Sequence, residues 1–258
     1  MTRMGRKNSV TSAGLQWIAY LTMLIDHFFA VVYYPLLNRP GATDGMWCLY
    51  RAGRAVGRIS FVLFAFMIAE GFHYTRDRKR YCLRIAALAV ISEIPFDLAF
   101  AQTVWNPESQ NIFFTLLLGI LALCLIGRWK EKPWLQFLAA AAACVAAWLL
   151  RTDYKFMGVI LIIMFAACRG KYGRQAVLGG LILYGGTFAM YVAEYIGYGY
   201  SVWDLAASAL RELYGMAAFV ILHHYHGEKG KRLPKWICYT FYPVHLLLLC
   251  LLKSICGW

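Results

Sequence analysis

Long apolar stretches separated by short polar connections make up most of the chain. Each stretch is continuously apolar, whereas the strands of a membrane barrel alternate apolar and polar residues. In a bilayer the backbone amides must be satisfied within the protein, so these segments are expected to be helices. The pattern therefore predicts an all-α polytopic membrane bundle of about nine transmembrane helices, although the window at 156–168 is short for a span. The apolar windows fall at 15–37, 57–75, 81–101, 111–127, 134–150, 156–168, 175–197, 202–223 and 236–253.

The length of 258 residues suits this arrangement. At ~20 residues per span, nine spans take ~180 residues and leave only short termini and loops. We therefore expect one transmembrane domain over residues 1–258, with no soluble domain beside it. The composition agrees, because 61% of the residues are hydrophobic and 15% are charged, against about 45–50% and 25% in a soluble protein.

The Lys and Arg residues are distributed unevenly between the two sides of the predicted bundle. With the N-terminus inside, 18 of the 26 lie on cytoplasmic segments, seven lie on outer segments that include Arg51, Arg54 and Arg58, and Arg211 lies within a span. Positive residues collect on the cytoplasmic side of membrane proteins. The distribution therefore predicts an N-terminus inside and a C-terminus outside. The net charge of +13 follows from this topology, and we expect no nucleic-acid partner.

The eight cysteines include no C-x-x-C pair. Most of them lie in apolar windows, where cysteine acts as a small buried hydrophobic residue, so neither a disulfide framework nor a zinc site is expected. His223, His224 and His226 form an H-H-x-H cluster beside a basic loop. Such a cluster is more often solvated than metal-bound, and no metal is expected.

Ionisable residues within the apolar windows are the strongest functional signal. A charged side chain at the bilayer centre costs at least ~2.5–3.5 kcal/mol, so these groups must pair or line a hydrated cavity. At ~1.5 Å per helical residue, groups from four different windows reach a similar depth, while Glu70 is shallower. Such a shared level is what a polar site in the middle of the membrane requires. The mid-depth residues are Asp26, His27, Glu93, Arg211, Glu212 and His245.

Polar positions cover about half of the first helix. Gln16, Tyr20, Met23 and His27 follow one another at spacings of three or four residues, which places them on one face. Asp26 belongs to the neighbouring polar face. A helix of this kind is expected to face the interior of the bundle, and the alternative is that Asp26 and His27 only lock helices together.

Two further pairs of ionisable groups each share a helix face. Glu70 and His73 lie three residues apart near the cytoplasmic end of the second helix, where they line a cavity or only anchor the helix at the interface. Glu93 and Asp97 lie four residues apart around Pro95, which removes one backbone hydrogen bond. This segment predicts a kinked polar lining rather than direct catalysis by both carboxylates.

Six short motifs are spread over nearly the whole chain. They are T-M-L-I-D-H at 22–27, G-R-I-S-F at 57–61, A-E-G-F-H at 69–73, S-E-I-P-F-D-L at 92–98, N-I-F-F-T-L at 111–116 and Y-P-V-H-L at 242–246. Together they resemble the TraX family of membrane proteins, named for a conjugation protein that acetylates pilin. One departure is Val62, where the family pattern has a proline after Phe61.

The resemblance implies a multi-pass enzyme of the bacterial cell membrane that takes an acetyl or similar group from cytosolic acyl-CoA. The acceptor would be an amine or hydroxyl on an envelope or extracytoplasmic peptide, glycan or lipid; in the namesake it is the N-terminal amine of pilin. The phosphates of acetyl-CoA would bind among the inner basic loops, although topology alone also explains the basic residues there. The candidates are Arg78, Lys79, Arg84, Lys229 and Arg232.

Acyl transfer needs a base that takes the proton of the acceptor, and donors that hold the oxyanion. We expect His27 to be the base, because the ordinary pKa of histidine lies near neutrality, with Glu93 from another helix fixing its tautomer. Asp26 lies about 100° from His27 around the helix, and is expected to position helix one or to pair with Arg58 or Arg211.

Three alternatives stay open at this point. His245 is the competing base, or the donor to the oxyanion. A proton-coupled transporter also needs charges in mid-membrane, and should show paired broken helices. A non-catalytic assembly factor for a surface structure would depend on neither His27 nor His245.

Overall fold

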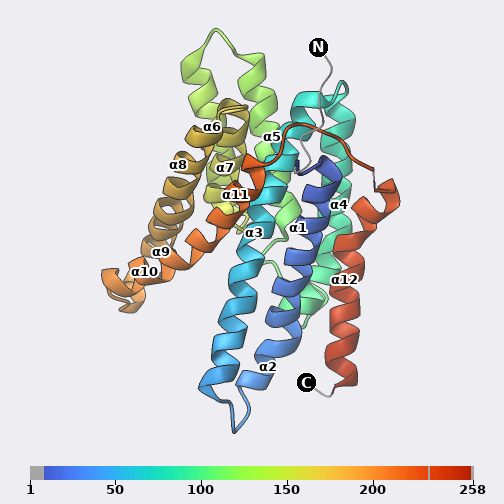
Figure 1. The fold of residues 1–258 in the computed structure, drawn as a ribbon. Helices are drawn as coiled ribbons and strands as arrows, with labels where there is room; N and C mark the ends of the chain where they lie inside the picture. The colour runs from blue at the N-terminus through green and yellow to red at the C-terminus, as the bar shows by residue number, and fades with distance from the viewer. Residues whose placement is uncertain (1–8, 232, 257–258) are drawn as a thin grey trace.

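The computed structural model describes residues 9–231 and 233–256, which form a bundle of nine helical rods (Figure 1). Three of the rods change helix type along their length. The continuous rods are α3 (Asp44–Tyr74), α4 (Arg78–Phe100), α5 (Ile112–Arg128), α6 (Pro133–Leu149), α7 (Lys155–Ala167) and α12 (Lys235–Ile255). The composite rods are α1 (Ser12–His27) with η1 (Phe28–Tyr33) and α2 (Tyr34–Leu37); α8 (Tyr172–Leu181) with η2 (Ile182–Gly186), α9 (Thr187–Tyr195) and η3 (Ile196–Tyr198); and α10 (Val202–Ala209) with η4 (Leu210–Met216) and α11 (Ala217–His223).

Five stretches in the described part of the chain are long and apolar enough to cross a membrane: Ser12–Leu37, Asp44–Tyr74, Tyr172–Tyr198, Val202–His223 and Trp236–Ile255. Helix α4 has 23 residues, but six of them are charged. Helices α5, α6 and α7 are apolar and contain 17, 17 and 13 residues. At 1.5 Å per residue α7 is about 20 Å long, less than the ~30 Å hydrocarbon core of a bilayer. The prediction of an all-α polytopic bundle is confirmed, with α7 as its short member.

The largest error in the predicted boundaries concerns α3, which begins at Asp44 rather than near residue 57. The side chain of Thr43 caps its first turn by accepting a hydrogen bond from the Met46 amide at 3.3 Å. Arg54 and Arg58 were expected in an outer connection and instead lie inside the helix. Hydropathy missed this part of α3 because its arginines offset the apolar residues between them.

Five segments that the charge pattern assigns to one side do lie together, at what we call the basic end of the bundle. The Val10 amide donates to the His224 carbonyl at 2.9 Å, and Arg169 bonds to Glu70 at 2.6 Å. The start of α1 and the end of α12 lie at opposite ends of the bundle (Figure 1), as an odd number of crossings requires. That the basic end faces the cytoplasm stays a prediction. The basic end comprises residues 9–13, 70–80, 127–132, 168–174 and 223–231.

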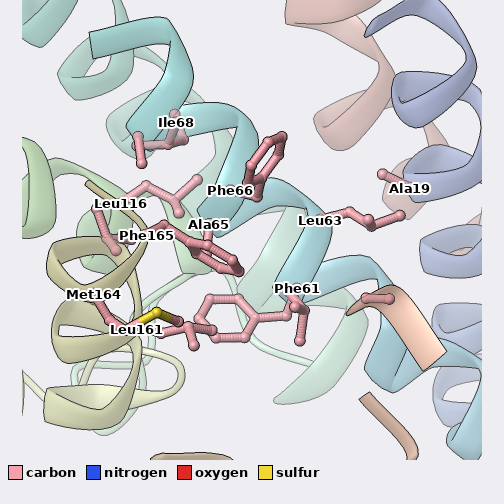
Figure 2. Packing of buried hydrophobic residues seen from close by; sticks show 14 of the residues in the cluster. Ala19, Phe61, Leu63, Ala65, Phe66, Ile68, Leu116, Leu161, Met164 and Phe165 are labelled. Carbon is pink, nitrogen blue, oxygen red and sulfur yellow. The ribbon is translucent and has the colours of Figure 1, made fainter. Parts of the chain in front are cut away.

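Helix α3 passes through the centre of the apolar core. Figure 2 shows Phe61 and Phe66 of α3 packed with Leu161 and Phe165 of α7 and with Leu116 of α5. The rings of Phe66 and Phe165 meet edge to face at 5.4 Å. Because so much of the core contacts α3, the groups that this helix carries are held rigidly.

The cysteines differ from their expected environment. All eight are free, but Cys48 and Cys256 are exposed and the other six are half-buried. In a membrane bundle the lipid-facing surface is as apolar as the core, so an apolar sequence context does not imply burial within the protein.

Helices α1 and α3 approach each other closely at two glycines of α3. A Cβ atom on Gly57 would lie 2.0 Å from the Asp26 Oδ1 atom, and one on Gly53 would lie 2.0 Å from the ring of Phe29. Small residues four positions apart allow membrane helices to pack with their backbones close together. The two glycines therefore fix the rotation of α1 against α3.

We expect Gly57→Ala to destabilise the protein by about 1–3 kcal/mol, because the new methyl group must displace Asp26 from a packed contact. Gly173→Ala is the matched control, since its Cβ would meet nothing within 4 Å. Thermal unfolding of the detergent-purified proteins measures both. Equal melting temperatures for the two variants would contradict the close α1–α3 contact.

Candidate functional site

Two histidines from helices at opposite ends of the sequence form a direct pair. The His27 Nδ1 atom of α1 lies 2.6 Å from the His245 Nε2 atom of α12. The two rings are nearly parallel, with an angle of 6° between their planes. His27 is half-buried and His245 is 5% exposed. His27 is also the last residue of α1 before the π-helical segment η1, and such segments are frequent at functional sites.

The hydrogen bonds of His245 determine where the protons of the pair lie. Its Nδ1 atom is 2.7 Å from the Phe241 carbonyl oxygen, which can only accept, so Nδ1 carries the hydrogen. In a neutral imidazole the Nε2 atom is then an acceptor, and His27 must donate to it from Nδ1. The Nε2 atom of His27 keeps its lone pair, and no hydrogen bond to it is present within residues 9–231 and 233–256.

Aromatic rings contact the histidine pair. Phe100 of α4 meets His27 edge-on at 5.4 Å between ring centres, and Tyr242 of α12 meets it at 5.9 Å. Tyr242 also lies 5.6 Å from His245. Phe100 and Tyr242 thus contact the pair from α4 and α12, and His245 also lines an apolar pocket of about 370 Å³.

Asp26 faces α3, in the direction that its predicted angle from His27 requires. Its Oδ2 atom lies 2.8 Å from the Arg54 guanidinium, which also donates to the Asp26 carbonyl oxygen at 3.4 Å. The predicted partners, Arg58 and Arg211, are wrong as direct contacts. Arg54 is the partner of Asp26 instead, because α3 begins at Asp44 and therefore includes Arg54, one turn before Gly57.

Arg58 lies in a second ion pair, one turn further along α3. It bonds to Glu212 of η4 at 3.1 Å and donates to the Tyr154 hydroxyl at 3.3 Å. The Tyr154 ring stacks on Phe61 at 3.7 Å. Tyr154 has a left-handed φ of 57°, which costs about 1–3 kcal/mol for a non-glycine residue. The contacts of Arg58 and Phe61 hold the loop in this strained conformation.

Arg211 does not join the central site, contrary to prediction. Its side chain is exposed and donates to the Ser208 hydroxyl at 2.8 Å. Successive residues of a 3₁₀ segment point about 120° apart. Glu212 therefore faces α3 while Arg211 points away from it.

Glu93 is buried but does not contact His27, so its predicted role in fixing the tautomer of His27 is not supported. Its Oε2 atom accepts a short hydrogen bond from the side chain of Asn111 and one of 3.3 Å from the Asn111 amide. Asp97 is fully buried and accepts from the Asn106 amide at 2.8 Å. Both carboxylates tie α4 to the 106–111 connection.

Glu70 lies at the basic end and acts there as an anchor. Arg169 binds both of its carboxylate oxygens, at 2.6 Å and 3.1 Å. These bonds raise the pKa of Arg169 above its ordinary value. His73 is exposed and stacks against Tyr74, so neither predicted cavity residue on this face reaches the central site.

An inner cavity of about 290 Å³ extends from Gly71 and Tyr81 to Tyr242, which contacts both histidines, and neither histidine lines it. Gly71 and Tyr81 line it near the basic end, and Tyr242 lines it beside the two histidines. The predicted polar face of α1 is confirmed in its first half, because Gln16, Tyr20 and Met23 all line this cavity.

The predicted phosphate ligands lie on the same end as the mouth of the cavity. Arg84 extends over the Tyr81 ring at 5.8 Å, and Arg78 lies over the Phe72 ring at 4.6 Å. Lys79 and Lys229 are exposed, and the Lys229 carbonyl accepts from the first turn of α1. Arg232 lies outside the described residues. None of these four cations lines the inner cavity.

A sequence profile described as TraX protein matches residues 11–253. The chain belongs to the TraX family. It is also similar to the probable fimbrial assembly protein FimC, serogroup H1, of Dichelobacter nodosus, with 27% identity over 272 residues that cover 97% of this chain and 98% of the relative. No solved structure matches the chain.

The site of this TraX protein contains four residues that the analysis of ionisable groups did not select. Asn111 and Tyr242 were visible as members of the short motifs, but amide and phenol groups are common in helices. Arg54 lies four residues before Arg58, so a longer helix would have placed it on the same face. No sequence signal indicated Tyr154, because its role depends on the fold of a loop.

We expect Glu212→Gln to destabilise this TraX protein by about 3–5 kcal/mol, because it leaves the Arg58 charge largely buried without its partner. The double variant Arg58→Leu/Glu212→Leu should recover most of that loss. Glu108→Gln breaks only an exposed pair with Arg151 and should have no measurable effect. Thermal unfolding tests all three, and a double variant no more stable than Glu212→Gln would contradict the pairing.

Proposed function

We propose that this TraX-family membrane protein is an acyl-CoA-dependent N- or O-acetyltransferase. The acyl donor binds at the basic end, which we place in the cytoplasm of a bacterial cell. The acceptor is an amine or hydroxyl presented by an envelope or extracytoplasmic peptide, glycan or lipid. The observation that carries this proposal is the free Nε2 atom of His27, which His245 holds in place. Both histidines contact Tyr242, and Tyr242 lines the inner cavity.

The proposed base is His27, acting through Nε2. It takes a proton from the neutral amine or hydroxyl of the acceptor as that atom attacks the thioester carbonyl. The bond between carbonyl carbon and sulfur then breaks, and the His27 imidazolium returns the proton to the CoA thiolate. Proton transfer by a positioned base contributes about 10²–10⁴-fold in rate.

His245 is a positioning residue in this mechanism. Its only N–H group is held by the Phe241 carbonyl, so the neutral ring has no donor left for an oxyanion. It accepts from His27 Nδ1 and thereby keeps His27 in the tautomer with a free Nε2. The sequence predicted that a carboxylate such as Glu93 fixes this tautomer.

The inner cavity supports the choice of donor. Acyl-CoA supplies an activated acyl group on a narrow pantetheine arm, and an apolar cavity with a few polar groups suits such an arm. Arg84, Arg78 and Lys229 are the residues that would bind its phosphates by charge-assisted hydrogen bonds. The thioester would then lie beside Tyr242, next to His27.

One observation favours a second candidate function. The relative from Dichelobacter nodosus is named for fimbrial assembly, so a non-catalytic factor that assists the assembly of a surface structure is compatible with it. The name also agrees with an acyltransferase whose acceptor is a subunit of such a structure. Dependence of the activity on His27 distinguishes these two functions.

We expect His27→Gln to lower acyl transfer by about 10²–10⁴-fold, because glutamine can hydrogen-bond but cannot take the proton. His245→Gln should lower it less, since its amide oxygen can still accept from His27. Transfer of radiolabel from acetyl-CoA to envelope extract, per folded molecule, measures both. His73→Gln is the control, because His73 is exposed at the basic end.

Binding of CoA distinguishes a variant that has lost only catalysis from one that has lost the binding site. A ligand at 100 times its dissociation constant adds ~2.7 kcal/mol of stability, and His27→Gln should keep the thermal shift that CoA gives the wild type. If His27→Gln retains more than about a tenth of the wild-type turnover, His27 is not the base. Absence of any CoA shift in the folded wild type would contradict the donor.

A further inference from the structure

Another pocket lies at the end of the bundle opposite the basic end. It has a volume of about 470 Å³ and lies between the α8–α9 and α10–α11 rods. Three tyrosines and one residue of each charge form most of its wall, and none of them belongs to the proposed acyl-transfer site. We call it the tyrosine pocket; it is lined by Tyr191, Tyr195, Tyr200, Asp204, Ser208 and Arg211.

Two opposite charges face the tyrosine pocket without pairing with each other. Asp204 and Arg211 are seven residues apart on one rod, which places them two turns apart on one face, and no ion pair joins them. Asp204 accepts from the Ser201 hydroxyl at 2.6 Å, and Arg211 donates to the Ser208 hydroxyl at 2.8 Å. In the described part of the chain neither forms a salt bridge. A dipolar ligand that lies between them would satisfy both.

The tyrosines define which end of such a ligand binds where. The Tyr195 ring meets Tyr191 at 5.8 Å and Tyr200 at 5.9 Å, both edge to face. Aromatic faces attract ammonium groups, and Asp204 adds a negative charge beside them. The guanidinium of Arg211, with the Ser208 hydroxyl, suits phosphate. The pocket thus offers an ammonium site and a phosphate site on one wall.

The surroundings of the pocket place it at the level of lipid headgroups. Trp203, in the first turn of α10, is 83% exposed, and Tyr198, the last residue of η3, is 80% exposed. Exposed Trp and Tyr residues at the end of membrane helices mark the interface between hydrocarbon and water. We propose that the tyrosine pocket binds the phosphoethanolamine headgroup of a membrane lipid in the leaflet opposite the basic end.

Native mass spectrometry of the detergent-purified full chain tests this proposal. The probes are short-chain phosphatidylethanolamine and phosphatidylglycerol, added in equal amounts. We expect the ethanolamine lipid to be retained about tenfold more, a difference of ~1.4 kcal/mol. Asp204→Asn should reduce its retention to that of the glycerol lipid, because the ammonium loses its charged partner, and Arg211→Gln should weaken both lipids.

Matched control variants distinguish a specific loss of lipid binding from a loss caused by unfolding. Asp44→Asn and Arg51→Gln change exposed charges on α3 and should leave lipid retention unchanged. Tyr200→Phe should retain the ethanolamine lipid and Tyr200→Leu should lose it, because only phenylalanine keeps an aromatic face.

Two results would overturn the proposal. Equal retention of the two lipids by the wild type, or no effect of Asp204→Asn, would mean that only adventitious lipid surrounds the helices. Binding of water-soluble phosphoethanolamine as tightly as the lipid would mean that the pocket takes a free metabolite. The acyl-transfer proposal is unaffected by either result, because it uses neither Asp204 nor Arg211.

Discussion

The close packing of α1 against α3 at Gly53 and Gly57 is the constraint on which the rest of the site depends. It fixes the rotation of α1 about its own axis, because the side chains of Phe29 and Asp26 fill the space that the two glycines leave. Asp26 then faces Arg54 on α3. His27, about 100° further around the helix, faces α12 and meets His245. A single helix contact therefore orients two neighbouring residues toward two different partners.

Paired charges are the second requirement of this architecture. Asp26 pairs with Arg54, and Arg58 with Glu212, so no full charge of these four has to be inserted alone into an apolar bundle. The Glu212 pair also joins α3 to the η4 segment, and through Tyr154 to the connection before α7. These contacts fix the side of α1 that carries Asp26, and so give His27 the rigid support that a base with a fixed tautomer requires.

The sequence predicted the helices better than their partners, for a physical reason. Hydropathy determines where a segment enters and leaves an apolar phase, so most predicted boundaries were close to the observed ones. The predicted start of α3 was wrong because arginines interrupt the first half of this helix. Pairing between helices depends on rotation and tilt, which hydropathy does not encode. His27 and His245 were both selected from their depth and their motifs, yet nothing in the sequence showed that they touch. Glu93 was predicted to bond to His27 because the two lie at a similar depth, but the side chain of Asn111 bonds to Glu93 instead.

The central claim is that His245 holds His27 in the tautomer whose Nε2 atom is free. Nitrogen-15 NMR of the histidine-labelled protein in lipid nanodiscs tests it directly, with His27→Gln and His245→Gln spectra to assign the two rings. The account predicts that both neutral rings carry their hydrogen on Nδ1, with a coupling across the bond from His27 Nδ1 to His245 Nε2. A His27 ring protonated on Nε2, with no coupling to His245, would contradict it.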